Sequence, residues 1–228
     1  MHPIEFPPLR RSSRSKFERL RLFAGLASLG LALLLPACKP RELQALLQPS
    51  QALASVVAGE TLRLAGPNKQ IALITHDASW GPPSAAEQAL RDALKKQGAT
   101  VFTAKAASLG DPMTSGQLGL KAADFFEALE KSTGAGAVIS LVGAPLLKEG
   151  DAARVKPDHP PVVVIATASL GDKMGVHGDQ VQLARLLEAK TIQLAIVDGA
   201  GPAAPPSAQA DPARELFDQH YRILRRPD

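Results

Sequence analysis

The chain has 228 residues, of which 45% are hydrophobic and 21% charged, and its formal net charge is +4. Six of the 26 basic and two of the 22 acidic residues precede residue 38, so 20 of each remain and residues 38–228 are neutral. A neutral chain offers no basic surface to nucleic acid, and a single cysteine excludes a disulfide framework. We therefore expect one domain held together by core packing.

The first 38 residues have the pattern of a secretory signal. Basic residues between Arg10 and Arg21 precede an apolar segment over residues 22–35 that no charge interrupts. The segment ends in the tetrapeptide Leu-Pro-Ala-Cys, and its cysteine, Cys38, is the only one in the chain.

This order of a basic region, a short apolar core, a small residue and a cysteine resembles the lipobox of bacterial lipoproteins. The resemblance implies a signal peptide over residues 1–37 and an acylated Cys38 that attaches the protein to a membrane. In Gram-negative lipoproteins an aspartate after the cysteine is an inner-membrane retention signal, so Lys39 implies the outer membrane, facing the periplasm. The alternatives are an uncleaved anchor, a buried helix and an ordinary signal peptide. An uncleaved anchor would have to span the bilayer, which needs about 20 apolar residues, whereas the segment over residues 22–35 has 14.

The remaining chain begins with a short connecting segment. Residues 38–50 indicate a tether with one or two helical turns, and residues 51–228 a single α/β domain. Ser50 is a candidate N-cap for a helix over residues 51–65, where apolar residues recur at helical spacing. Gly66 and the proline after it predict the end of this helix.

From residue 70 onward, predicted strands and helices alternate. Apolar runs predict five strands, over residues 71–75, 100–103, 137–142, 161–168 and 193–197. Helical periodicity predicts helices over residues 85–97, 118–131 and 179–189. Such alternation is typical of parallel sheets with right-handed crossovers. The sequence therefore predicts a three-layer, Rossmann-like or flavodoxin-like α/β fold, with a mainly parallel five-stranded sheet and helices on both faces.

Two segments interrupt this alternation. Residues 144–160 contain three prolines and no helical face, which indicates either a functional flap or an eroded crossover helix. Residues 199–212 are rich in Ala, Pro and Gly and are typical of a flexible surface segment. A final amphipathic helix over residues 213–224 is expected to dock on the sheet domain.

Parallel α/β sheets bind ligands beyond the carboxyl ends of their strands, near the point where the strand order reverses. The candidate ligand-binding residues are those that the predicted strands place there: His76, Asp77, Ser79 and Trp80 after the first strand, Gly143 after the third, Ser169 and Asp172 after the fourth, and Asp198 after the fifth. The single tryptophan, Trp80, either stacks on a planar ligand or anchors the core.

The sequence holds no decisive motif for cofactor or metal chemistry. The turn after the first strand lacks the paired glycines of a dinucleotide site, and no phosphate-binding loop is present. The histidines have no zinc-ligand spacing, and the Gly-x-Ser-x-Gly motif of serine hydrolases is absent. We therefore expect no cofactor, no metal and no catalytic residue. A hydrolase that uses His76 or Asp77 is the least favoured alternative.

The pattern over residues 70–200 is weakly similar to one lobe of the type I periplasmic substrate-binding proteins. The similarity lies in the strand over 71–75, the helix that ends at Gly98, and the strand that begins near Ala135. Those receptors clamp their ligand between two lobes, and this chain has the length of one. The resemblance implies a one-lobed domain that binds a small molecule or a partner protein without catalysis. A scaffold in an envelope or secretion assembly is the alternative.

Overall fold

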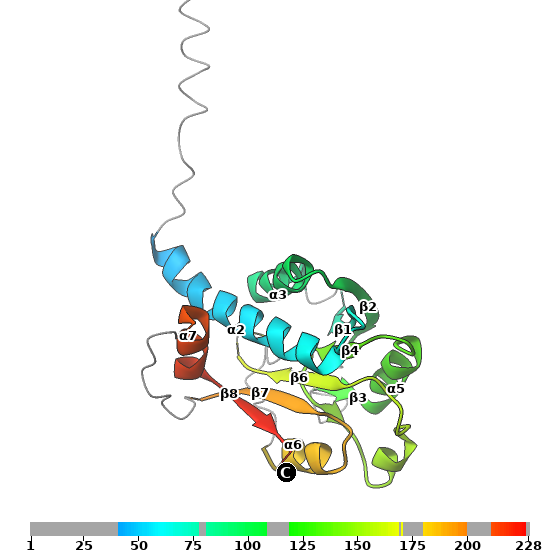
Figure 1. Cartoon of the computed structure of the whole chain (residues 1–228). Helices are drawn as coiled ribbons and strands as arrows, with labels where there is room; N and C mark the ends of the chain where they lie inside the picture. The colour runs from blue at the N-terminus through cyan, green and yellow to red at the C-terminus, as the bar shows by residue number, and fades with distance from the viewer. Residues whose placement is uncertain are drawn as a thin grey trace, which may run out of the picture. The chain divides into compact units, whose positions relative to one another are not determined.

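The computed structural model describes residues 41–77, 81–108, 119–168, 170, 180–199 and 211–226, with the side chains of the first helix from residue 48 (Figure 1). Residues 42–228 form one compact unit. Outside the described ranges lie the predicted signal, residues 200–210, and the candidates Cys38, Ser79, Trp80, Ser169 and Asp172. Among the helices that are described, none combines the length and the apolar character that a membrane span requires.

A six-stranded sheet forms the centre of the domain, in the order β2-β1-β4-β6-β7-β8. Its strands are β1 (Gln70–His76), β2 (Thr100–Ala107), β4 (Ala137–Ser140), β6 (Val162–Ala166), β7 (Leu194–Asp198) and β8 (Tyr221–Arg225). All neighbours are parallel except β8, which pairs antiparallel with β7. The predicted mainly parallel sheet is confirmed, with six strands in place of five.

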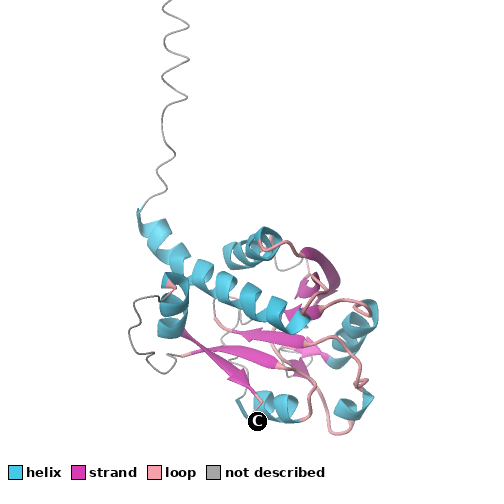
Figure 2. Ribbon diagram, viewed as in Figure 1, coloured by secondary structure: helices cyan, strands magenta, loops and turns pink. Residues whose placement is uncertain are grey.

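Helices cover both faces of this sheet (Figures 1 and 2). One face carries α2 (Arg41–Ala65), α3 (Ala85–Lys96) and α7 (Pro212–His220), and the other carries α5 (Ala122–Lys131) and α6 (Gln180–Glu188). Side chains alternate along each strand between the two resulting cores. In β1, for example, Ile71 and Leu73 belong to one core, and Ala72 and Ile74 to the other. The predicted three-layer arrangement is therefore confirmed.

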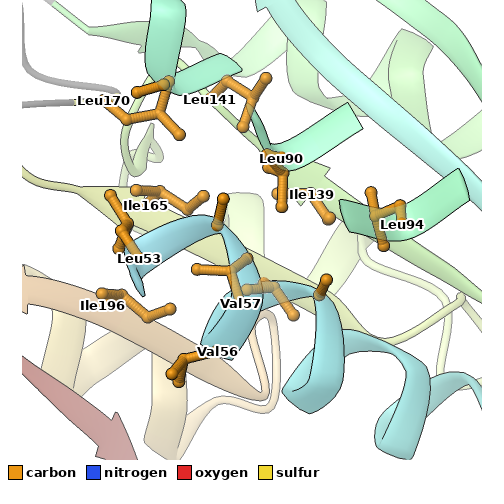
Figure 3. Packing of buried hydrophobic residues seen from close by; sticks show 14 of the residues in the cluster. Leu53, Val56, Val57, Leu90, Leu94, Ile139, Leu141, Ile165, Leu170 and Ile196 are labelled. Carbon is orange, nitrogen blue, oxygen red and sulfur yellow. The ribbon is translucent and has the colours of Figure 1, made fainter. Parts of the chain in front are cut away.

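The core beneath α2 and α3 consists mainly of apolar side chains (Figure 3), with Thr61 of α2 also fully buried. Leu53 of α2 and Leu90 of α3 are fully buried in one cluster with Ile139, Ile165 and Ile196 from three neighbouring strands. Burial of each such side chain stabilises the fold by roughly 1.5–3 kcal/mol. Packing of this kind holds the domain without a disulfide.

The predicted start of the first helix differs from the structure. α2 begins at Arg41 and runs for 25 residues, so residues 41–50 are helical and Ser50 lies inside the helix instead of capping it. Pro49 also lies inside α2. A proline followed by a serine is a common local signal at helix starts, because proline inside a helix loses one backbone hydrogen bond and crowds the carbonyl group of the preceding turn. The helix nevertheless continues through Pro49, and Ala52, Leu53 and Ala54 beyond it are buried in the core.

The predicted C-terminal helix over residues 213–224 is wrong beyond residue 220. α7 ends at His220, and the next five residues form β8 along the edge of β7. Tyr221 and Ile223 contact the core beneath α2, and Leu224 contacts the opposite core. The same apolar residues fit a helical stripe, but the backbone of β7 would then lack partners along one edge.

The connection between β4 and β6, residues 141–161, contains no α-helix. Within it, β5 (Pro145–Leu146) pairs with β3 (Leu120–Lys121) in a small parallel sheet, and Asp151–Arg154 form a turn of 3-10 helix. The proline-rich segment thus takes the place of a crossover helix and leads from the carboxyl end of β4 to the amino end of β6.

Candidate functional site

The strand order reverses between β1 and β4. The chain passes from β1 outward to β2 and then returns to β4 on the other side of β1. In sheets of this kind, ligands bind in the crevice outside the carboxyl ends of the two strands at the reversal. His76 ends β1 and Asp77 follows it, and Gly143 follows β4. The structure therefore brings these three predicted residues to the expected edge of the sheet.

A cavity with a volume of about 500 Å³ adjoins the end of β1. It is lined by two residues of β1, three of the following loop and two of α3: Thr75, His76, Gly81, Pro82, Pro83, Glu87 and Arg91. Small-molecule sites commonly have volumes of about 300–1,000 Å³. Of the predicted candidates that are described, His76 lines this cavity.

An ion pair forms the α3 wall of the cavity. Nη2 and Nε of Arg91 lie 2.9 and 3.0 Å from the same carboxylate oxygen, Oε1 of Glu87. Arg91 also donates to Oγ1 of Thr103 on β2, at 3.3 Å. The hydroxyl of Ser84 caps α3 by accepting from the backbone N–H of Glu87, at 3.1 Å. These contacts hold a guanidinium and a carboxylate in fixed positions beside the cavity.

The other described candidates shape the backbone at the carboxyl edge. Ser140 donates from Oγ to the carbonyl oxygen of Gly143 at 2.6 Å, and Gly143 adopts a φ of 82°, which favours glycine. Oδ2 of Asp198 accepts from the backbone N–H of Ala168 at 2.8 Å and so joins the ends of β7 and β6. Neither Gly143 nor Asp198 lines the cavity beside β1.

Three polar lining residues were missed by sequence reasoning: Thr75, Glu87 and Arg91. Thr75 is buried near the end of the apolar strand β1 and belongs to no recognisable motif. Glu87 and Arg91 have the i, i+4 spacing of an ordinary ion pair on a helix surface. The one available signal was the position of Glu87 three residues after the cap at Ser84, at the helix end that faces the carboxyl edge.

Comparison with known proteins gives a similarity in structure alone. No protein-family model matches the chain, and no curated protein matches it. Among solved structures, the chain is similar to a periplasmic ribose ABC transporter protein from Conexibacter woesei, with 10% identity and a TM-score of 0.41. The similarity covers 65% of this chain and 45% of that protein, so the chain spans less than half of its length.

Proposed function

We propose that this protein is a lipid-anchored lipoprotein of the bacterial envelope whose α/β domain binds a small molecule at the end of β1 without catalysis. The observation that carries the binding role is the cavity of about 500 Å³ at the strand reversal, with His76 and the Glu87–Arg91 pair in its wall. A preformed concave site with a few oriented polar groups is typical of ligand binding.

The chemistry of this wall favours a neutral polar ligand. The carboxylate of Glu87 and the guanidinium of Arg91 already neutralise each other at 2.9 Å, so a charged ligand would have to compete with that pair. A hydroxyl group can instead accept from a remaining guanidinium N–H or donate to a remaining carboxylate lone pair. Molecules that carry several hydroxyl groups over a small apolar surface therefore suit the cavity best.

A binding role is favoured over hydrolysis by the placement of the predicted acid–base candidates. His76 and Asp77 are consecutive residues at a strand end, where neighbouring side chains are directed to opposite sides. The carboxylate of Glu87 already accepts two hydrogen bonds from Arg91, at 2.9 and 3.0 Å.

The proposed location in the cell envelope depends on the first 38 residues. The signal pattern ends at Cys38, and the neutral charge of residues 38–228 leaves acylation as the means of membrane attachment. Because Lys39 stands where an aspartate would retain a lipoprotein in the inner membrane, we propose that the anchor lies in the outer membrane and the domain in the periplasm.

Thermal shift with a panel of sugars and polyols tests the binding role on the purified protein. A ligand at 100 times its Kd stabilises the native state by about 2.7 kcal/mol. In Arg91→Met the guanidinium is lost but the apolar stem is kept, so we expect the shift to fall strongly. The matched control is Lys95→Met, an exposed cation on the same helix. If Arg91→Met and Lys95→Met give the same shift as the unmodified protein, the proposed site is wrong.

A further inference from the structure

A second cavity, also of about 500 Å³, lies at the opposite edge of the sheet, next to the residues that precede β1, β4 and β6. We call it the amino-edge cavity, because these residues lie at the amino ends of the strands. Its apolar walls come from the last turn of α2, from α5 and from the end of the β4–β6 connection: Leu64, Ala65, Phe126, Leu129, Val155 and Pro160. The proposed function at the carboxyl edge does not use this cavity.

The sheet side of the amino-edge cavity is tightly built. Asn68 donates from Nδ2 to the carbonyl oxygen of Gly134 at 2.7 Å and accepts at Oδ1 from the backbone N–H of Gln70 at 3.1 Å. Gly136 donates its N–H to the carbonyl oxygen of Gln70 at 2.7 Å. A Cβ added at Gly136 would overlap the carbonyl group of Asn68, so the close approach requires glycine.

The loop side is also held in place. The guanidinium of Arg154 lies over the ring of Phe126, 4.2 Å from its centroid, and 3.2 Å from Oδ1 of Asp151. The two ring nitrogens of His159 lie 2.7 and 3.2 Å from the carbonyl oxygens of the next residue and of Lys190. The cavity is therefore preformed between fixed walls.

Three charged side chains at the rim have no ion pair or hydrogen bond within the described part of the chain. They are the carboxylates of Glu130 and Asp158 and the ammonium group of Lys156, and all three are exposed. α2 and α5 also end beside the cavity, at Ala65 and Lys131, and the carbonyl ends of helices carry partial negative charge. The rim thus offers both negative and positive groups around an apolar interior.

We propose that the amino-edge cavity binds a short apolar peptide with free termini. Its ammonium group would meet Glu130, Asp158 and the helix ends, and its carboxylate would meet Lys156. Apolar side chains would cover Phe126 and Leu129. An extended tripeptide is roughly 10 Å long, which matches the diameter of a sphere with the volume of the cavity, roughly 10 Å.

Binding of Leu-Leu-Leu to the purified full chain, measured by titration calorimetry, tests the proposal. Acetylation of the amino end or amidation of the carboxyl end should each weaken binding about tenfold, because each removes a charge-assisted contact. The variant Glu130→Gln/Asp158→Asn should weaken the free peptide but leave the acetylated peptide unchanged. The variant Lys156→Met should weaken binding of the free peptide but leave binding of the amidated peptide unchanged. All three residues are exposed, so these variants are expected to fold.

Matched controls lie in the same loop but outside the cavity: Glu149→Gln and Lys148→Met should bind as the unmodified chain does. Arg91→Met should also leave peptide binding unchanged, which separates this site from the one at the carboxyl edge. The proposal is overturned if the free peptide does not bind, if the doubly blocked peptide binds equally well, or if Arg91→Met abolishes binding.

Discussion

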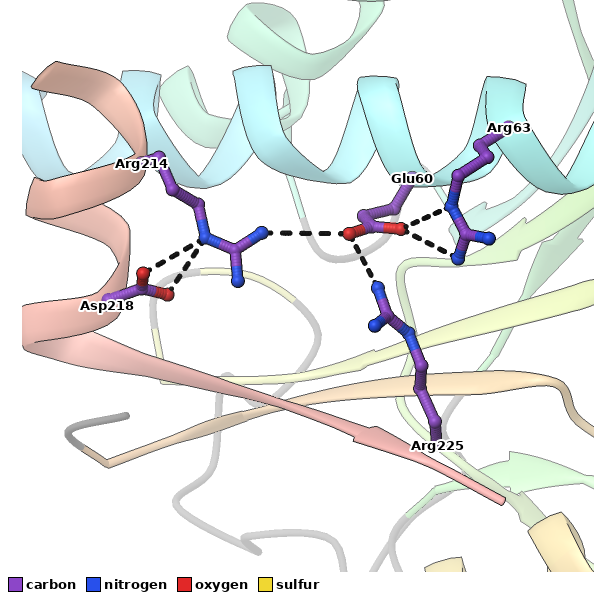
Figure 4. A network of polar contacts seen from close by, with 5 residues as sticks. All are labelled: Glu60, Arg63, Arg214, Asp218 and Arg225. Atoms are coloured by element: carbon purple, nitrogen blue, oxygen red, sulfur yellow. Dashed lines mark hydrogen bonds and ion pairs between the residues drawn. The ribbon is translucent and has the colours of Figure 1, made fainter. Parts of the chain in front are cut away.

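Glu60 of α2 is the point where three arginines meet (Figure 4). Its Oε1 lies 2.6 Å from Nη2 of Arg225 on β8 and 3.6 Å from Nη1 of Arg214 on α7. Its Oε2 lies 3.0 Å from Nη2 of Arg63, one turn along α2. The Glu60 side chain is 13% exposed and that of Arg225 49%. This carboxylate therefore links α2 to both C-terminal elements.

We predict that Glu60→Gln lowers the free energy of unfolding by about 2 kcal/mol. The short contact with Arg225 is a charge-assisted hydrogen bond, which contributes about 1 kcal/mol once its half-exposed partner is taken into account. The longer contacts with Arg214 and Arg63, at 3.6 and 3.0 Å, contribute about 0.5 kcal/mol each. The change to glutamine keeps the shape of the side chain, so the loss reports on charge rather than on packing.

Urea unfolding with a constant m-value measures this difference. The matched control is Glu188→Gln, an exposed carboxylate in the last turn of α6, which should change stability by less than 0.5 kcal/mol. A double-mutant cycle between Glu60 and Arg225 should give a coupling of about 1 kcal/mol. A cycle with no coupling, or a Glu60→Gln loss as small as that of the control, would refute this account of how the C-terminal elements are held.

Three further predictions concern the anchor, acid stability and the core. Cys38→Ala should abolish labelling by an alkyne fatty acid and release the protein from membranes; a variant that is still labelled would contradict acylation at this residue. Hydrogen bonds from Lys105 and Lys131 lower the pKa of Glu127 from 4.5 to about 2. Its contribution to stability is therefore complete above pH 4.5 and is lost as the pH falls toward 2, so Glu127→Gln should flatten the fall of Tm over this range, and an unchanged slope would argue against these bonds. Leu90→Ala should lower the free energy of unfolding by about 2–5 kcal/mol, because the side chain is fully buried; a loss below 1 kcal/mol in urea unfolding would contradict the packing described.

The elements that could be predicted are those whose signal is local. β1 and β6 are apolar runs bounded by turn formers, and burial on both faces makes such runs unambiguous. β8 could not be recognised in this way, because its apolar residues also fit a helix and the free edge of β7 decides between them. The pattern of apolar residues shows which structures a segment can form, but whether residues 221–225 form a helix or a strand depends on the partner strand β7.

The same division applies to the candidate sites. His76 was predictable because the end of a strand marks the carboxyl edge, but Arg91 reaches the cavity only through the way α3 packs across β1 and β2. The amino-edge cavity had no local signal at all. It arises where the end of α2, the end of α5 and residues 154–161 meet, and these segments are far apart in the sequence.

The early start of α2 has a mechanical consequence for a protein held at Cys38. Ten residues in a helix span about 15 Å, whereas the same ten residues extended span up to roughly 35 Å. With residues 41–50 helical, α2 begins three residues after Cys38, the proposed site of acylation. A domain anchored at that cysteine would stay nearer to the lipid surface than one held by the same ten residues in extended form.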